Sequence, residues 1–365
     1  MQTFSKIAER IINQRLTKFA KLNGLYSLRQ TGSLPQRATI DAGISLRYWV
    51  QEAQAAGLKA STMFLDIKGG FDNVDHSTLL RRVQTKNVPN YMAKWISNFI
   101  SYRQCAIIFP GSPREMRGIN TSILQGSPLS PILFVVYVEP LHDCIDPSRE
   151  FTSSYVDDIQ TTVSSNSWCM NSKLLEEGLT RIKNIATSLG LEYSTNKAGL
   201  IHWRAPREKV ARSDHPIVVD GECIQPAPTA VKWQRFYFEN NYCTWTHYAN
   251  RLALVQAAFD RIKRLSSPGC RLIPYSAGRM VKAFIIPTLQ YGAECLDLSA
   301  TMRHKMEVLL KRVKQWITNC FYSTNTNILS AVTNQPSVKV FLTGNDYLTI
   351  IGYRHSLRSL LRLSL

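Results

Sequence analysis

The sequence has 365 residues, 44% of them hydrophobic, so the chain can bury a substantial core and is expected to fold as about two globular domains. Lysine and arginine total 44 against 26 acidic residues, and the net charge of +18 indicates a polyanionic partner, with nucleic acid as the first candidate. The eight cysteines form no Cys-x-x-Cys pair and no apolar run is long enough to cross a bilayer, so neither a zinc site, a disulfide framework nor a membrane partner is indicated.

The amino-terminal part of the chain predicts two helices and then a buried strand. Apolar residues at helical spacing predict helices over 4–22 and 39–56, separated by a turn-rich stretch at 29–35. The apolar run 61–67 fits a strand buried on both faces. Asp66 is therefore expected at the exit of a core strand.

The next part predicts mostly helix. Residues 76–100 are expected to form two helices with a turn at Val88 and Pro89, and residues 104–109 a strand. Ser127 and Pro128 can cap and start a helix over 129–141.

A pair of acids follows at a predicted turn. The apolar stretches 151–156 and 159–163 flank Asp157 and Asp158, which predicts a tight hairpin with both acids at its tip. An amphipathic helix over 173–189 ends at Gly190. An Asp-Asp pair in a turn is usually a turn former with solvated side chains, so its surroundings must decide its role.

The carboxyl-terminal part begins after the proline-containing stretch 226–228. Helices are predicted near 246–266 and 301–320, each with one apolar face. The opposite faces are expected to expose the basic residues Arg251, Arg261, Lys263, Arg264, Lys311, Arg312 and Lys314.

These acids suit one kind of chemistry. Forming a phosphodiester bond builds negative charge on the attacking and leaving oxygens, which two divalent ions about 3.5–4 Å apart can stabilise. Such ions need hard oxygen ligands on rigid backbone. Asp66, Asp157 and Asp158 would supply them if the hairpin lies beside the strand that carries Asp66.

The residues around these acids resemble the motifs of the reverse transcriptase family, and most closely those of non-long-terminal-repeat, LINE-like retrotransposons of fungal type. FLDIKGGFDNV (64–74), LQGSPLSPILF (124–134) and YVDD (155–158) are similar to the first three palm motifs, in the family's order. Three matches in order are specific, and the resemblance covers nearly the whole chain.

Three further segments continue the resemblance. GLEYSTNKAGLIHW (190–203) is similar to the fourth palm motif, VKWQRFYF (231–238) to the hairpin that grips the primer, and QTGSLPQRATIDA (30–42) to the fingers segment that contacts the incoming triphosphate.

The resemblance implies an α/β fold, with a right-hand polymerase palm of antiparallel sheet and helices, partial fingers and a mostly α-helical thumb. It divides the chain into partial fingers over 1–60, a palm over 61–225 with a fingers insertion at about 76–120, and a primer-grip hairpin with a helical thumb or carboxyl-terminal region over 226–365.

The resemblance also implies an RNA-directed DNA polymerase, a nucleotidyltransferase that extends a primer 3'-hydroxyl. Asp66, Asp157 and Asp158 would be its catalytic, metal-binding residues, with Asp66 and Asp157 as direct ligands of two Mg²⁺ ions that Mn²⁺ can replace. The partners would be an RNA template, a DNA primer and deoxynucleoside triphosphates. The localisation would be nuclear or cytoplasmic, with the nucleus favoured, and the oligomeric state is left open.

Further residues match positions with a role in the family. Lys197 would protonate the departing pyrophosphate, and Arg37 would pair with the triphosphate as a planar fork. Phe71 would lie under the sugar and exclude a ribose 2'-hydroxyl, while Gln125 and Gly126 would shape the nucleotide and template pocket. Four of them have a structural alternative: a solvated cation for Lys197 and Arg37, a core phenylalanine for Phe71, and a plain helix start for Gly126. A helix start does not explain Gln125.

Some departures from the family pattern keep other interpretations open. The family's fingers begin before the part that this chain matches, which predicts an incomplete template grip. Gln234 and Arg235 stand where Leu-Gly is usual, and a side chain there would cost about 1 kcal/mol if φ is positive. One alternative is an inactive retroelement relic that binds RNA or DNA through its basic surface. The other is a nucleotide cyclase or another palm-like two-metal enzyme, in which acids also lie on adjacent strands.

Overall fold

The computed structural model describes residues 3–27, 29–101, 103–107, 115–143, 146, 149–204, 208, 215–219, 221–265, 272–293, 295–335 and 337–338. The chain divides into two units, Met1–Pro228 and Thr229–Leu365, so the division falls at the end of the proline-containing stretch. In the described part of the chain, no helix is both long enough and apolar enough to cross a membrane.

The first unit is built around a five-stranded sheet with β1 (Lys59–Lys68) at its centre. β5 (Asp158–Ser165) runs antiparallel along one edge of β1, and β4 (Glu150–Tyr155) pairs with β5. β7 (Gly199–Trp203) and the two-residue β6 (Glu192–Tyr193) pair with the other edge of β1. The strand over 61–67 was predicted correctly, although β1 is longer by two residues at its start and one at its end.

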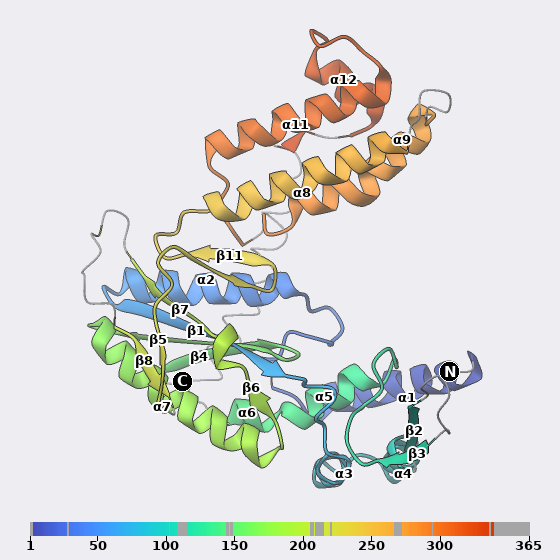
Figure 1. Cartoon of the computed structure of the whole chain (residues 1–365), viewed down its shortest axis with the longest axis vertical. Helices are drawn as coiled ribbons and strands as arrows, with labels where there is room; N and C mark the ends of the chain where they lie inside the picture. The colour runs from blue at the N-terminus through green and yellow to red at the C-terminus, as the bar shows by residue number, and fades with distance from the viewer. Residues whose placement is uncertain are drawn as a thin grey trace. The chain divides into compact units, whose positions relative to one another are not determined.

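Two long helices cover this sheet. α2 (Thr39–Ala55) packs on one face and α7 (Trp168–Ser188) on the other, and the two helices lie above and below the strands in Figure 1. Residues 60–65 of β1 are therefore buried on both faces of the sheet. α7 begins five residues before the predicted helix, because the side chain of Ser167 caps it by accepting from the N–H of Met170.

The rest of the first unit adds further helices and two hairpins. They are the helices α1 (Thr3–Leu22), α3 (His76–Thr85), α4 (Asn90–Ile100), α5 (Ser130–Val138) and α6 (Pro140–Asp143), and the hairpins β2 (Arg103–Ile107) with β3 (Glu115–Ile119) and β8 (Ile217–Val219) with β9 (Glu222–Ile224). Eight of the nine residues of α5 are buried, so this helix belongs to the core of the unit.

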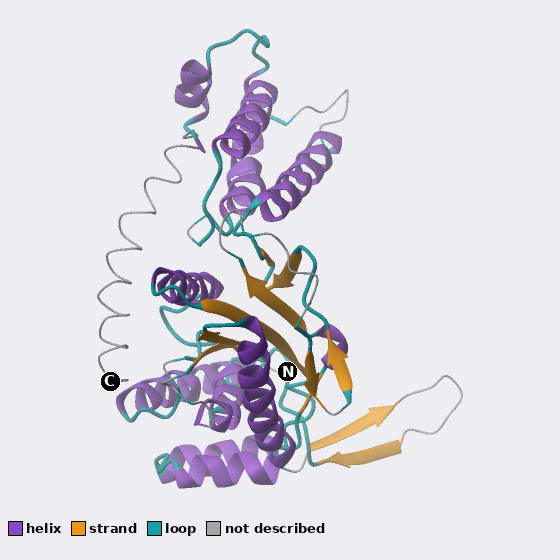
Figure 2. Cartoon of the chain, turned by 90° about the vertical axis from the view of Figure 1, so that its left-hand side faces the viewer, coloured by secondary structure: helices purple, strands orange, loops and turns teal. Residues whose placement is uncertain are grey.

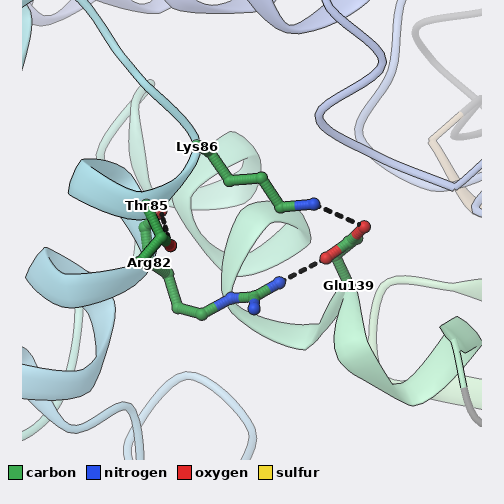
Figure 3. A network of polar contacts seen from close by, with 4 residues as sticks. All are labelled: Arg82, Thr85, Lys86 and Glu139. Atoms are coloured by element: carbon green, nitrogen blue, oxygen red, sulfur yellow. Dashed lines mark hydrogen bonds and ion pairs between the residues drawn. The ribbon is translucent and has the colours of Figure 1, made fainter.

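The predicted continuous helix over 129–141 is wrong in one respect, because it breaks at Glu139. Pro140 has no N–H and cannot continue the helical hydrogen-bond ladder, so α5 ends and α6 begins there. Figure 3 shows how the junction is fixed: the buried carboxylate of Glu139 accepts from Arg82 and from Lys86, whose Nζ lies 2.8 Å from Oε1. The junction is thereby tied to the end of α3.

The second unit is mostly helical, as the purple ribbons of Figure 2 show. It begins with the hairpin β10 (Ala230–Trp233) and β11 (Phe236–Glu239) and continues through α8 (Trp245–Arg264), α9 (Pro274–Met280), the π-helical segment η2 (Val281–Ile285), α10 (Ile286–Gln290), α11 (Ala300–Thr318) and α12 (Thr326–Thr333). α8 and α11 match the two predicted helices. The elements over 274–290 and α12 were not predicted.

Two of the basic residues expected on exposed faces are in fact buried. Arg251 donates to the carbonyl oxygen of Arg235 at 2.6 Å and lies over the ring of Tyr291, 4.4 Å from its centroid. Lys314 donates to the hydroxyl of Ser330 on α12 at 2.8 Å. Burial lowers the pKa of both groups, so these two cations are part of the structure of the unit and not of its charged surface.

Candidate active site

Three carboxylates meet where β1 ends. Asp66 pairs directly with Asp158 across the antiparallel strands β1 and β5, and Asp157 lies in the turn before β5. Directly opposed residues on such strands have Cα atoms about 4.5–5.5 Å apart. The N–H of Ile67 donates to the carbonyl oxygen of Asp157 at 3.1 Å, which fixes the turn against β1. The expectation that the hairpin tip lies beside Asp66 is confirmed.

The turn that carries Asp157 has an unusual backbone. Tyr155 pairs with Asp158, so Val156 and Asp157 form a two-residue turn, and Val156 has a φ of +61°. Glycine normally fills the first position of such turns when its φ is positive, and a β-branched residue is strained there. The backbone next to two of the three acids is therefore held in a costly conformation, as is common at functional sites.

Lys197 brings a cation to these acids. Its ammonium group lies 2.6 Å from Oδ2 of Asp66, and its side chain is 68% exposed. It stands at the end of the short 3₁₀ turn η1 (Thr195–Lys197), which follows β6, and the N–H of Ser194 donates to the carbonyl oxygen of Asp66 at 3.0 Å. The hydrogen bond to Asp66 raises the pKa of Lys197, so the lysine keeps its proton.

Crowding shifts the titration of the acids. Burial, together with the charges of Asp157 and Asp66, raises the pKa of Asp158 to about 7, and Lys197 opposes the shift. Burial and the charge of Asp66 also raise the pKa of Asp157. Negative charge is therefore held here at a free-energy cost that a positive ion would remove.

The carboxylates of Asp66 and Asp157 fit a magnesium site in which substrate phosphates supply some of the ligands. In the part of the chain that the structure describes, no three His, Cys, Asp or Glu side chains are arranged to hold a metal ion together. Mg²⁺ typically takes one or two carboxylates and completes its octahedron with water and phosphate oxygens. Asp66 and Asp157, hard oxygen donors on two hydrogen-bonded segments, can supply those carboxylates.

Phe71 lies in the same neighbourhood and is half-buried. Its ring stacks on Phe134 of α5, with centroids 4.9 Å apart and planes 11° apart. Gly70 brings this pair close to the acids, because a Cβ at Gly70 would lie 2.8 Å from Phe134 and 3.6 Å from the Cβ of Asp157. The core and sugar-facing interpretations of Phe71 are compatible, since the ring packs on one side and is partly exposed.

Gln125 and Gly126 form a turn beside the first motif. The N–H of Ser127 donates to the carbonyl oxygen of Leu124 at 3.2 Å, and Gly126 has a φ of +82°, which requires a glycine-like backbone. The exposed amide of Gln125 donates to Asp72 at 3.1 Å. The second motif is thus joined to the first by a side-chain contact.

Ser127 fixes this turn, and the predicted cap at Ser127 is wrong because Leu129 is the N-cap residue of α5. The hydroxyl of Ser127 donates to the buried carboxylate of Glu9 on α1 at 2.6 Å and accepts from the N–H of Leu129 at 3.1 Å. Glu9 is a residue whose importance the sequence did not indicate.

Arg37 lies on the segment 30–42, which borders the hairpin of β4 and β5. Its Nη1 donates to the carbonyl oxygen of Gln30 at 3.0 Å, a contact within its own segment, so its pairing with a triphosphate stays a prediction. The segment continues the sheet, because Gln30 forms a parallel bridge with Ser154 of β4. Thr31 donates to the carbonyl oxygen of Ser154 through both its N–H, at 2.7 Å, and its hydroxyl, at 2.8 Å.

The turn between β10 and β11, in the segment that resembles a primer grip, lies in the second unit and has a strained backbone. Gln234 and Arg235 have φ of +51° and +64°, so two residues with side chains fill a turn that favours glycine. Two hydrogen bonds to the backbone hold the turn. The hydroxyl of Tyr291 donates to the carbonyl oxygen of Gln234 at 2.6 Å, and Arg251 donates to the carbonyl oxygen of Arg235.

Comparison with known proteins gives the family. A family model described as reverse transcriptase (RNA-dependent DNA polymerase) matches residues 1–233. The chain is 21% identical over 328 residues to the probable RNA-directed DNA polymerase from transposon BS of Drosophila melanogaster, an alignment that covers 88% of this chain and 36% of that protein. It is 22% identical over 305 residues to the RNA-directed DNA polymerase from mobile element jockey of the same species, covering 82% and 33%.

A solved structure agrees in fold. Telomerase from Candida albicans, determined in complex with the TWJ fragment of telomeric RNA, aligns with a TM-score of 0.52 at 11% identity, over 92% of this chain and 57% of that chain. This similarity, with the antiparallel sheet and its helices, confirms the predicted right-hand polymerase fold class.

The five-stranded sheet has the right-hand polymerase fold, and three acids lie together at the end of its central strand. More specifically, this chain belongs to the reverse transcriptase (RNA-dependent DNA polymerase) family, because the family model matches more than half of its length. The two Drosophila relatives confirm the resemblance to non-long-terminal-repeat retrotransposon polymerases, whereas the fungal type stays a prediction. The chain spans about a third of the length of these curated relatives.

Proposed function

We propose that this chain is the polymerase region of an RNA-directed DNA polymerase from a non-long-terminal-repeat retrotransposon. It would add deoxynucleotides to a primer 3'-hydroxyl on an RNA template, with two Mg²⁺ ions that Mn²⁺ can replace. The observation that carries the proposal is the direct pairing of Asp66 with Asp158, beside Asp157, in a chain of this family.

The carboxylates have separate tasks in this mechanism. Asp66 and Asp157 would hold the ions, which when bound stabilise charge on the attacking and leaving oxygens. Asp158 is half-buried beside them with a pKa raised to about 7, so near neutral pH it moderates the negative charge at the site. The strand pairing of β1 with β5 keeps the acids in place without help from substrate.

Lys197 would act at the leaving group. In the structure it is paired with Asp66, and its exposure leaves the side chain free to turn towards a triphosphate when Asp66 binds an ion. A protonated ammonium group beside phosphate oxygens can give its proton to the departing pyrophosphate. In the free protein the hydrogen bond to Asp66 raises the pKa of Lys197, so the lysine enters the reaction protonated.

The neighbouring residues would select the nucleotide. Phe71 would block a ribose 2'-hydroxyl with the exposed part of a ring that Phe134 holds in place. Gln125 and Gly126 would border the nucleotide and template, since the turn there presents backbone without a side chain at Gly126. Arg37 would pair with the triphosphate as a bidentate donor.

The net charge of +18 supports a template and primer as partners. Exposed lysines and arginines on α8 and α11, such as Arg261, Lys263 and Arg312, would follow the phosphate backbone without reading sequence, and binding would weaken steeply with salt. A nuclear or cytoplasmic location, with the nucleus favoured, goes with the retrotransposon assignment.

Primer extension tests the proposal. The purified chain, given an RNA template, a DNA primer, deoxynucleoside triphosphates and Mg²⁺, is expected to extend the primer, and Asp157→Asn is expected to lose about three orders of magnitude in rate. Equal signals from the two proteins would support the inactive relic that binds nucleic acid. A cyclic nucleotide formed from free triphosphates without template would support a cyclase instead.

A further inference from the structure

We propose that Gln30 is a positioning residue whose side-chain amide holds the strained Val156 turn and thereby sets Asp157 for metal binding. The inference rests on the proposed polymerase function. Gln30 lies outside the three segments that resemble palm motifs, 126 residues away from Val156 in sequence.

The amide of Gln30 makes two hydrogen bonds at the turn. Its Oε1 accepts from the N–H of Val156 at 3.0 Å and from the N–H of Gly32 at 2.9 Å. Both partners are N–H donors, so only the oxygen of the amide can face them. Gln30 is 1% exposed, which means that water does not compete for these bonds.

Val156 needs such a partner because its backbone is strained. A valine at φ +61° is disfavoured by its β-branch, and the turn could relax by rotating the peptide that precedes it. That rotation would turn the N–H of Val156 away from Gln30. It would also disturb Asp157, whose carbonyl oxygen accepts from the N–H of Ile67.

The surroundings are shaped for this contact. A Cβ at Gly32 would lie 2.5 Å from the nitrogen of Val156 and 2.6 Å from its Cγ2, so only glycine lets the segment approach the turn. The backbone of Gln30 accepts from Arg37, the residue assigned to the triphosphate. Gln30 therefore contacts both Arg37, through its backbone, and the turn that carries Asp157, through its side chain.

Thr31 provides a matched control for simple docking. It is buried next to Gln30, and its hydroxyl donates to the carbonyl oxygen of Ser154 on β4 and not to a residue of the turn. Thr31→Val and Gln30→Met each remove side-chain hydrogen bonds of the same docked segment while keeping its bulk. Only Gln30→Met releases Val156.

The experiment compares metal dependence in the full chain. Half-saturating Mg²⁺ in primer extension, and Mn²⁺ affinity by electron paramagnetic resonance without nucleic acid, are measured for wild type, Gln30→Met, Thr31→Val, Val156→Gly and the double variant Gln30→Met with Val156→Gly. Thermal melting of each variant reports on folding.

Gln30→Met is expected to raise the half-saturating Mg²⁺ concentration and the Mn²⁺ dissociation constant about tenfold, since the strained Val156 turn loses the acceptor that holds it. Thr31→Val is expected to lower only the melting temperature. The double variant is expected to bind Mn²⁺ like Val156→Gly alone, because glycine adopts a positive φ without strain. Equal metal constants for Gln30→Met and Thr31→Val, or for Gln30→Met and wild type, would overturn the inference. A wild type that binds Mn²⁺ without extending primers would overturn the proposed function instead.

Discussion

The ammonium group of Lys197 lies 2.6 Å from Oδ2 of Asp66, although the two residues are 131 positions apart in sequence. The contact depends on β6, whose two residues pair with the end of β1 and bring the following turn to the acids. A cation thus neutralises the first carboxylate of the site in the free protein. In the proposed reaction the pair must separate, with Asp66 turning to an ion and Lys197 to the triphosphate.

Replacing Lys197 tests its role as the proton donor. Lys197→Met is expected to lower kcat about 100-fold with little change in KM for the nucleotide, because general acid catalysis contributes to the chemical step. Steady-state extension kinetics measure both constants. Lys68→Met is the matched control, since Lys68 is an exposed lysine two residues from Asp66 on β1, and it is expected to retain near wild-type kcat. An equal loss in both variants would mean that only positive charge matters.

The raised pKa of Asp158 predicts how stability depends on pH in the absence of metal. Its carboxyl has a pKa of about 7 in the folded protein against an ordinary value of 3.8, so between these values the folded state binds more protons than the unfolded state. Its contribution to stability is therefore lost as pH rises from about 4 to about 7.

Asp158→Asn removes this titration. With EDTA present, it is expected to raise the melting temperature by about a few degrees at pH 8 and to leave it unchanged at pH 4. Melting curves at the two pH values, with and without Mg²⁺, give the measurement. A gain that is the same at both pH values would show that Asp158 does not titrate in this range.

The strained turn between β10 and β11 predicts a stabilising substitution. Arg235 has a φ of +64°, a conformation that costs a residue with a side chain about 1–2 kcal/mol relative to glycine. Arg235→Gly is expected to increase the free energy of unfolding by about 1 kcal/mol in urea titrations. Lys232→Gly, in the middle of β10, is the control and is expected to destabilise, because glycine weakens a strand interior.

The ion pairs in Figure 3 predict a strongly destabilising substitution. Glu139→Ala leaves Arg82 and Lys86 without their carboxylate partner, and is expected to lower the free energy of unfolding by about 2 kcal/mol. The exposed Glu177 on α7 is the control, with an expected change within about 0.5 kcal/mol for Glu177→Ala. Similar losses for the two variants in urea titrations would show that the junction at Glu139 is not held by these contacts.

The strand that carries Asp66 and the hairpin that carries Asp157 and Asp158 could be predicted from the sequence. The core strand with Asp66 and the hairpin with Asp157 and Asp158 follow from short apolar runs, which bury on both faces of a sheet. Their meeting depends on long-range strand pairing, which apolar runs alone do not determine. β6, with two residues, is too short for any periodicity to indicate.

The predicted exposure of two basic residues was wrong because it depends on contacts between residues distant in sequence. Helical periodicity placed Arg251 and Lys314 on exposed faces because it cannot show that a carbonyl of Arg235 or the hydroxyl of Ser330 will accept from them. The segment with Gln30 was recognised by resemblance, but its bond to Val156 becomes visible only once the segment lies beside β4.

In the proposed reaction, Asp66 and the turn with Asp157 bind one pair of ions. Replacing Mg²⁺ by Fe²⁺ and adding ascorbate and peroxide generates radicals that cut the backbone near bound iron. In the wild type, the chain is expected to be cut close to both Asp66 and Asp157. Excess Mg²⁺ is expected to suppress both cuts, and Asp157→Asn to abolish them. Cutting near only one of the two segments, or cutting that Asp157→Asn leaves unchanged, would show that Asp66 and Asp157 do not share the ions.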